Sequence, residues 1–409
     1  MKNIVTMLVA IILLLGVLPT VISDDTTPPE IKNVVALPSS IIQGETVTIK
    51  CDVTDNEEVN VVKVVIEYPD NSTVNMTMKK STNKANEYYY TNMYKVVGTY
   101  KYHIWANDTS GNSNVSSNHT FYVGKDIYPP VTYCNLYGKK GKNNWYVSNV
   151  SVELIATDKG MGVKDTYYML EGKPWLQYKN MFKVTNEGIY DLYYYSVDNA
   201  GNKEDIKYKT FKIDKTKPTT TYELNGYKGN DGWYITNVTV HLFASDAVSG
   251  INKTFYRIGN GSWQTYSNEF AISKDGVYTV YYYSVDRAGN TEDIKHFTLK
   301  IDKAKPIATI VKPRRGYLYL WDREIMPTLF GNTLIIGRIT IFVDASNHES
   351  GIQKVQFYID NILQIEDSEP PYAWEWNYLA IGTHLIKVVA YDNAGNYGMD
   401  EMVVKVFNI

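Results

Sequence analysis

"YYYSVDNAGNKEDIK" at residues 193–207 is repeated almost unchanged as "YYYSVDRAGNTEDIK" at residues 281–295. The copies lie 88 residues apart (281 − 193 = 88), and the same spacing links residues 130–214 to residues 218–302 without a gap. A repeat of this length exceeds the usual solenoid unit and suits one small β-sandwich. Looser copies of the line, "YHIWANDTSGN" and "IKVVAYDNAGN", flank the pair. The repeats predict modules 1 to 4, at residues 24–125, 126–214, 215–303 and 304–409.

The repeated line has the alternation of a β-strand. In "GVYTVYYYSVD" the residues Tyr278, Val280 and Tyr282 share one face, and the matching positions in the other copies are mostly apolar or aromatic. A period of two marks the core face of a strand, and "AGN" or "SGN" then supplies a turn. Several short alternating strands per module, with no helical period after residue 23, predict an all-β chain of antiparallel Greek-key sandwiches.

Composition narrows the function. The chain has 36 tyrosines and 13% aromatic residues, which favours strands. Its net charge is −3 and it has no basic tract, so nucleic acid is not an expected partner. The motifs of serine hydrolases, zinc proteases, P-loop enzymes and dinucleotide-binding enzymes are absent, and the six histidines are scattered. We therefore predict a protein that is not an enzyme and has no catalytic residue.

The first 23 residues have the pattern of a secretory signal peptide. Lys2 precedes an apolar stretch, and Ser23 is a small residue placed before an acidic pair. Pro19 interrupts the stretch just before the expected cleavage site. We predict cleavage and export to the cell surface or the medium. The alternative is an uncleaved anchor, because the stretch approaches the length that spans a membrane.

The two cysteines lie in different modules, so no disulfide within a module is expected. Cys51 shares a strand face with Val47, Ile49 and Val53. That position predicts a small buried apolar residue and not a reactive thiol.

Glycosylation sequons are dense before residue 304. They are Asn71, Asn75, Asn107, Asn114, Asn118, Asn149, Asn237, Asn252 and Asn260. In an exported protein they predict a glycan-coated surface, if the host has the transferase. The alternative is that strands rich in Asn and Thr generate sequons by chance.

A strip of aromatic residues lies on the strand face opposite the core. Its members are Trp105, Tyr193, Tyr195, Tyr281 and Tyr283. Such a strip can stack on sugar rings. The alternative, which we favour, is cross-strand aromatic pairing, with Trp175 and Trp263 covering part of the sheet.

Module 4 carries an insertion at residues 312–338, in which two apolar runs flank a loop that contains Pro. We expect a hairpin packed on the module. The alternative is an exposed edge that recruits another chain.

Acidic residues recur at fixed places in the modules. Each module is led by Asp-x-x-x-Pro, has an oxygen-bearing residue at the end of an early strand, and ends its penultimate strand with another Asp. The leading Asp is counted with the module that it introduces, although Asp214 and Asp302 fall at the end of the preceding residue ranges. These residues are Asp25, Asp55 and Asp108 in module 1, Asp126, Asp158 and Asp198 in module 2, Asp214, Asp246 and Asp286 in module 3, and Asp302, Asn347 and Asp392 in module 4. If they share one end of the sandwich, they predict a Ca²⁺ site in modules 2 and 3 above all. The alternative is that the loop aspartates only cap turns.

Motifs in the modules resemble known families. The central pair, with "W-Y-x-x-N-V-x-V", "W-x-x-Y" and "Y-Y-Y-S-V-D-x-A-G-N-x-E", resembles the repeat named after a spirochaete outer-membrane Omp-L protein. Module 4, with "SGIQKVQFYID" and "PPYAWEWN", is similar to bacterial and archaeal Ig-like surface domains, and module 1 is a looser match. The resemblance implies four Ig-like sandwiches in an extracellular setting. Such modules carry many functions, so it implies little about activity.

Two functions follow from these patterns. The first is a non-enzymatic exported protein for adhesion, envelope structure or display, with other surface proteins or extracellular polysaccharide as partners. The second is a carbohydrate-binding accessory protein that uses the aromatic strip. Calcium is the one cofactor that the sequence suggests.

Overall fold

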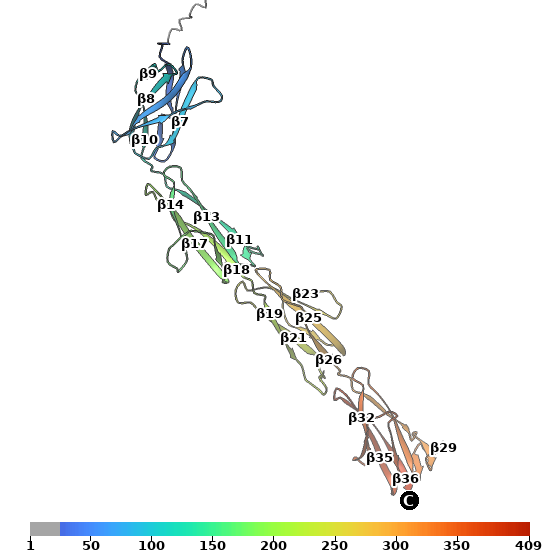
Figure 1. The fold of residues 1–409 in the computed structure, drawn as a ribbon. Coiled ribbons are helices and arrows are strands. Elements are labelled where there is room, and N and C mark those ends of the chain that lie inside the picture. Colours follow the sequence, from blue (N-terminus) through green and yellow to red (C-terminus); the bar gives the residue numbers. More distant parts are fainter. Residues whose placement is uncertain (1–24) are drawn as a thin grey trace, which may run out of the picture. The chain divides into compact units, whose positions relative to one another are not determined.

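The computed structural model describes residues 25–409, so the predicted signal peptide lies outside the described residues (Figure 1). The described residues form strands and no helix, and every sheet takes its strands from one module. None of them forms a helix with the length and apolar character needed to cross a membrane. The fold is therefore all-β, as the alternation predicts.

Module 1 consists of two facing sheets, with strand orders β1-β3-β7-β6 and β2-β10-β8-β4-β5, and β9 pairs with β8. Its strands are β1 (Glu30–Leu37), β2 (Ser40–Ile42), β3 (Thr46–Thr54), β4 (Val59–Glu67), β5 (Thr73–Thr77), β6 (Lys79–Lys80), β7 (Glu87–Met93), β8 (Gly98–Asp108), β9 (Ser113–Val115) and β10 (His119–Gly124). Cys51 lies in its core, only 1% exposed, and burial raises the pKa of its thiol to about 12. Cys51 and Cys134 are both free and buried, which confirms that Cys51 is a core residue.

Modules 2 and 3 have the same topology, a sheet of three strands facing a sheet of five. The orders are β11-β13-β16 with β12-β18-β17-β14-β15, and β19-β21-β24 with β20-β26-β25-β22-β23. Module 2 contains β11 (Val131–Tyr137), β12 (Trp145–Tyr146), β13 (Val150–Thr157), β14 (Val163–Leu170), β15 (Leu176–Gln177), β16 (Phe182–Val184), β17 (Gly188–Asp198) and β18 (Lys207–Ile213). Module 3 contains β19 (Thr219–Asn225), β20 (Trp233–Tyr234), β21 (Val238–Ser245), β22 (Ile251–Ile258), β23 (Gln264–Tyr266), β24 (Phe270–Ile272), β25 (Gly276–Asp286) and β26 (Lys295–Ile301).

Module 4 has a three-stranded sheet, β27-β31-β34, and a seven-stranded sheet, β29-β28-β30-β36-β35-β32-β33. Its strands are β27 (Ile307–Lys312), β28 (Tyr317–Leu320), β29 (Arg323–Pro327), β30 (Thr333–Ile336), β31 (Ile339–Ser346), β32 (Ile352–Ile359), β33 (Ile362–Asp367), β34 (Ala373–Trp376), β35 (Ala380–Asp392) and β36 (Tyr397–Asn408).

The insertion of module 4 extends its larger sheet. β30 pairs in parallel with the last strand, β36, as β12 and β20 pair with the last strands of modules 2 and 3. β28 and β29 form the added hairpin beside β30. The two apolar runs, which form β28 and β30, pair in parallel, so they do not form the expected hairpin with each other. Packing on the module is confirmed, because Tyr319 and Ile335 are each 1% exposed in its core. Leu329 and Phe330, at the tip, are 96% and 89% exposed. Recruitment of another chain there stays a prediction.

The repeated line supplies the core of its module. On β25, Val280 and Tyr282 are buried against Leu299 of β26 and other apolar residues. Ser284 is also fully buried, and its hydroxyl lies 2.6 Å from that of Thr220. The carboxylate of Glu292, in the turn after β25, is buried beside both. Buried polar groups must find partners, and this cluster satisfies them. The sequence did not reveal it, since Glu is usually exposed.

Candidate metal centres

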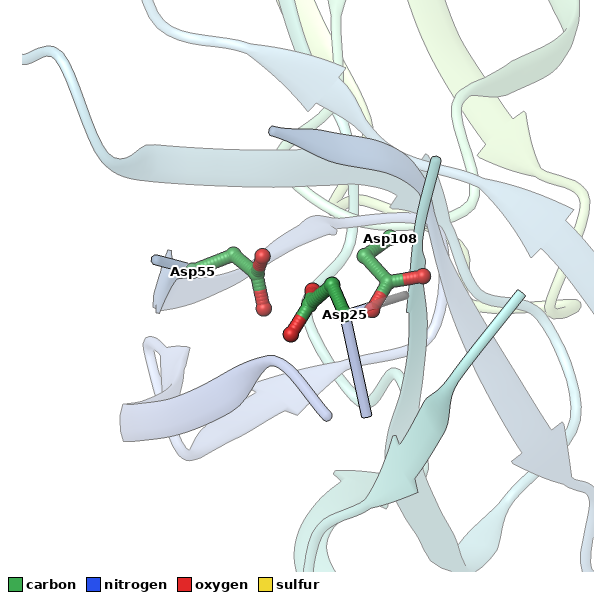
Figure 2. A group of neighbouring side chains, drawn as sticks. All are labelled: Asp25, Asp55 and Asp108. Atoms are coloured by element: carbon green, nitrogen blue, oxygen red, sulfur yellow. The ribbon is translucent and has the colours of Figure 1, made fainter. Parts of the chain in front are cut away.

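The recurring aspartates of modules 1, 2 and 3 gather at one end of each sandwich. In each triad, one carboxylate oxygen per residue lies within 4.8 Å of the other two. The first Asp precedes the module's first strand, the second follows an early strand in one sheet, and the third ends a strand of the other sheet. Figure 2 shows Asp25, Asp55 and Asp108 of module 1 converging in this way. The structure thus brings together the residues that the sequence singled out.

Main-chain N–H groups orient the module 2 triad. Asp126 is fully buried and its Oδ2 accepts from the N–H of Met161 at 2.7 Å. One oxygen of Asp158, Oδ2, accepts from the N–H groups of Gly160 and Gly162 at 2.9 and 2.8 Å. A side chain at Gly160 would collide with the Asp126 carboxylate, because an added Cβ would lie 2.1 Å from Oδ2. Glycine here lets the loop approach the carboxylate.

The third member of each triad is held by an asparagine four residues further on. In module 2, Asp198 is fully buried and accepts from the N–H of Asn202 at 2.7 Å and from its Nδ2 at 2.8 Å. The same Nδ2 lies 3.1 Å from the carbonyl oxygen of Asp126. The Asn of "AGN" therefore ties the last strand end to the segment that leads into the module.

Module 3 repeats this geometry. Asp214 Oδ2 accepts from the N–H of Ser249 at 3.1 Å, and Asp246 Oδ1 accepts from the N–H of Gly250 at 2.7 Å. Asp286 is fully buried and accepts from Asn290 Nδ2 at 2.8 Å. Burial, together with the negative charges of Asp246 and Asp286, raises the pKa of Asp214. The groups that donate to this triad are main-chain N–H groups and the Asn290 amide, and none of them is positively charged. The triad therefore gathers negative charge that these donors do not neutralise.

Each of the three triads also contains buried carboxylate oxygens without a hydrogen-bond partner. They are Oδ2 of Asp25, Oδ2 of Asp55, Oδ1 of Asp158 and Oδ2 of Asp246. Turn capping explains the other oxygen of Asp55, Asp158 and Asp246, which accepts main-chain N–H groups. Capping does not explain a charged oxygen that is removed from water and left unpaired, which is costly unless a cation or donor meets it.

Module 4 has the same arrangement with one exchange. Asp302 and Asp392 are fully buried in the corresponding places. Asn347 stands where the other modules have Asp, and its Nδ2 lies 3.3 Å from Asp392 Oδ2. Burial raises the pKa of Asp392, and the charge of Asp302 adds to the effect.

The aromatic strip is occupied by contacts within its own module. Tyr195 packs edge-on to Trp175 at 4.9 Å between ring centroids and stacks on Tyr167 at 5.3 Å. Tyr283 makes the matching edge contact with Trp263 at 4.8 Å. These ring contacts are the aromatic pairing that we expected for the strip. Sugar binding by the strip stays a prediction.

Eight of the nine sequon asparagines are exposed. The ninth, Asn107, is half-buried, and its Oδ1 is among the buried oxygens without a partner. Exposure makes the eight accessible to a transferase, and their use stays a prediction.

A bacterial Ig domain family matches residues 331–388, which lie in module 4. No curated protein matches the chain. Among solved structures, fibronectin(III)-like modules of CbhA from Clostridium thermocellum align at 20% identity and TM-score 0.26, over 46% of this chain and 94% of that one. A tetra-tandem repeat from the extending region of a large adhesion protein aligns at 12% identity and TM-score 0.31, over 94% of this chain and 100% of that one. A bacterial ice-binding adhesin aligns at 14% identity and TM-score 0.24, over 66% of this chain and 97% of that one.

TM-scores of this size carry no functional information, and strand pairing defines the fold. The chain is a repeat protein of Ig-like sandwiches, and residues 331–388 of module 4 are similar to the bacterial Ig domain family. The likeness of the central modules to the Omp-L repeat stays a prediction.

Proposed function

We propose that the chain is an exported, non-enzymatic surface protein of the adhesion type, in which modules 1, 2 and 3 each bind one calcium ion at the aspartate triad. The observation that carries the proposal is the buried carboxylate oxygen without a partner, which recurs in all three triads. A cation at the centre of each triad would meet these oxygens and offset the repulsion between the carboxylates.

The chemistry of the triads favours calcium over other metals. All of the gathered ligand atoms are carboxylate oxygens, which suit hard cations, whereas zinc and copper sites usually include His or Cys. Calcium accepts six to eight oxygens in irregular geometry, so main-chain carbonyls and water can complete the shell. Magnesium requires a near-ideal octahedron, keeps several waters and usually takes only one or two carboxylates, so a triad of protein carboxylates suits it less.

Calcium at these places would hold the leading segment of a module against two of its loops. In module 2 the ion would join Asp126, which precedes β11, to Asp158 after β13 and Asp198 at the end of β17. Binding to the folded state alone stabilises it by RT ln(1 + [L]/Kd). Extracellular modules typically bind calcium with Kd near 10⁻⁴–10⁻³ M, so such sites would fill outside the cell. This dependence fits the export that the signal sequence predicts.

Isothermal titration of the mature chain with CaCl₂ tests the proposal. We expect three bound ions per chain, and two ions after Asp246→Asn. The matched control is Asp293→Asn, which removes one exposed carboxylate from the same module and should leave three ions bound. Absence of saturable binding, or equal losses in both variants, would refute the calcium sites.

A further inference from the structure

Module 4 preserves the frame of the calcium sites with one side chain exchanged. Asp302 Oδ2 accepts from the N–H of Ser350 at 3.1 Å, as Asp214 Oδ2 accepts from Ser249 at 3.1 Å. Asp392 accepts from Asn396 as Asp286 accepts from Asn290. The same loops and the same two buried carboxylates are therefore present. Only the second position differs, because it is Asn347.

The main chain fixes the orientation of the Asn347 amide. Its Oδ1 accepts from the N–H groups of Glu349, Ser350 and Gly351 at 3.2, 3.0 and 3.0 Å. Only the amide oxygen accepts from N–H groups, so Nδ2 must point to the opposite side. There Nδ2 lies 3.3 Å from Asp392 Oδ2 and 3.5 Å from the carbonyl oxygen of Ala304.

Module 3 shows what Nδ2 replaces. Asp246 caps its turn with Oδ1, which accepts from Val248 and Gly250, as Asn347 does with its own Oδ1. The other oxygen of Asp246 is buried and has no partner, whereas the corresponding atom of Asn347 is a donor with two acceptors. Capping alone does not distinguish Asp from Asn here. The difference lies in the atom that faces the other carboxylates.

We infer that the Asn347 amide does in module 4 what a cation does in modules 1, 2 and 3, so that module 4 is independent of calcium. The inference rests on the calcium sites proposed above. In module 4 an N–H donor stands where module 3 has a carboxylate oxygen without a partner, and it gives Asp392 Oδ2 a second donor beside Asn396 Nδ2. The loss of one carboxylate also removes repulsion at the same centre. An amide that points N–H groups at the centre also leaves a cation no oxygen ligand on that side.

The amide also indicates a further ligand in the calcium-binding modules. Ala304, whose carbonyl faces Nδ2, is two residues after the leading Asp302. The residues two after the leading aspartates of modules 2 and 3 are Tyr128 and Thr216. The carbonyl oxygen of Tyr128 lies 3.5 Å from Asn202 Nδ2, which also donates to Asp198 of the triad. Carbonyls at these places would join the three carboxylates around the ion, which moves the oxygen count closer to the six that calcium requires.

The division has a consequence for the whole chain. Removal of calcium should loosen modules 1, 2 and 3 and leave module 4 as stable as before. Module 4 carries the hairpin of β28 and β29, so the hairpin would be presented whether or not calcium is present.

Hydrogen exchange of the full mature chain, read peptide by peptide with 1 mM CaCl₂ or with EGTA, tests the inference. If free calcium is ten times its Kd, chelation should lower protection about tenfold in modules 1, 2 and 3. Protection in module 4 should not change. Asn347→Asp should make module 4 sensitive to EGTA and raise the bound calcium from three ions to four. Asp246→Asn should make module 3 insensitive to EGTA.

The outcomes separate the inference from the proposal beneath it. Four ions bound to the unmodified chain, or loss of module 4 protection with EGTA, would overturn the role of Asn347 while the calcium sites stand. No bound calcium at all would overturn both. If Asn347→Asp does not fold, the Asp246→Asn chain still decides, because a module 3 that remains sensitive to EGTA contradicts the replacement of a cation by an amide.

Discussion

Replacement of Glu292 by Gln should destabilise module 3 by about 2–4 kcal/mol, because Gln has one acceptor oxygen where the carboxylate uses two. Glu292 Oε1 accepts from the N–H of Ser284 at 2.8 Å, and Oε2 accepts from the N–H of Thr220 at 3.1 Å. Lys295 Nζ lies 2.9 Å from Oε2. The Gln amide supplies one acceptor, so its NH₂ group would face a buried N–H that has lost its partner. A buried donor without an acceptor costs about 1–3 kcal/mol, and loss of the charge weakens the bonds that remain.

Hydrogen exchange in peptides from β25 and β26 of the full mature chain measures the effect. A loss of 2 kcal/mol should speed the exchange of core amides about 30-fold, if they exchange through opening of the module. Glu204→Gln should act in the same way on module 2 only, since Glu204 makes the corresponding bonds. Asp293→Asn is the control, because its side chain is 93% exposed. Core exchange of module 3 that changes less than twofold in Glu292→Gln would refute the account of the buried cluster.

Three further predictions concern the sites and export. The gain in stability from calcium should shrink as pH falls through the raised pKa of Asp214, because protons compete with the ion for the carboxylates. Calorimetric melting with calcium or with EGTA, between pH 7 and pH 4, measures the difference in melting temperature. The double substitution Tyr281→Ala, Tyr283→Ala should lower the melting temperature of module 3, and the altered chain should bind a glycan array no differently from the unmodified chain. Sugar binding that only the unmodified chain shows would favour the carbohydrate-binding alternative. Protein from the native host should begin near Asp24 and exceed its sequence mass, and an intact Met1 or an unmodified mass would contradict export with glycosylation.

The sequence alone determined the repeat, the fold class and the positions of the aspartates. Strand alternation is a local property, so the core face of β25 can be read from residues 276–286. The recurrence of Asp at three fixed places in modules 1, 2 and 3 predicted which side chains gather, since the loops of a sandwich meet at its ends. The sequence also marked Asn347 as the exception.

Tertiary structure decided which atoms face one another. Glu292 and Thr220 are 72 residues apart, and only the packing of two sheets shows that the carboxylate is buried and paired. β30 joins β36 through pairing of residues about 70 positions apart along the chain, which no local pattern specifies. The orientation of each Asp carboxylate follows from the turn that it caps, so the oxygen left without a partner appears only in three dimensions. The same holds for Nδ2 of Asn347, whose acceptors come from distant parts of its module.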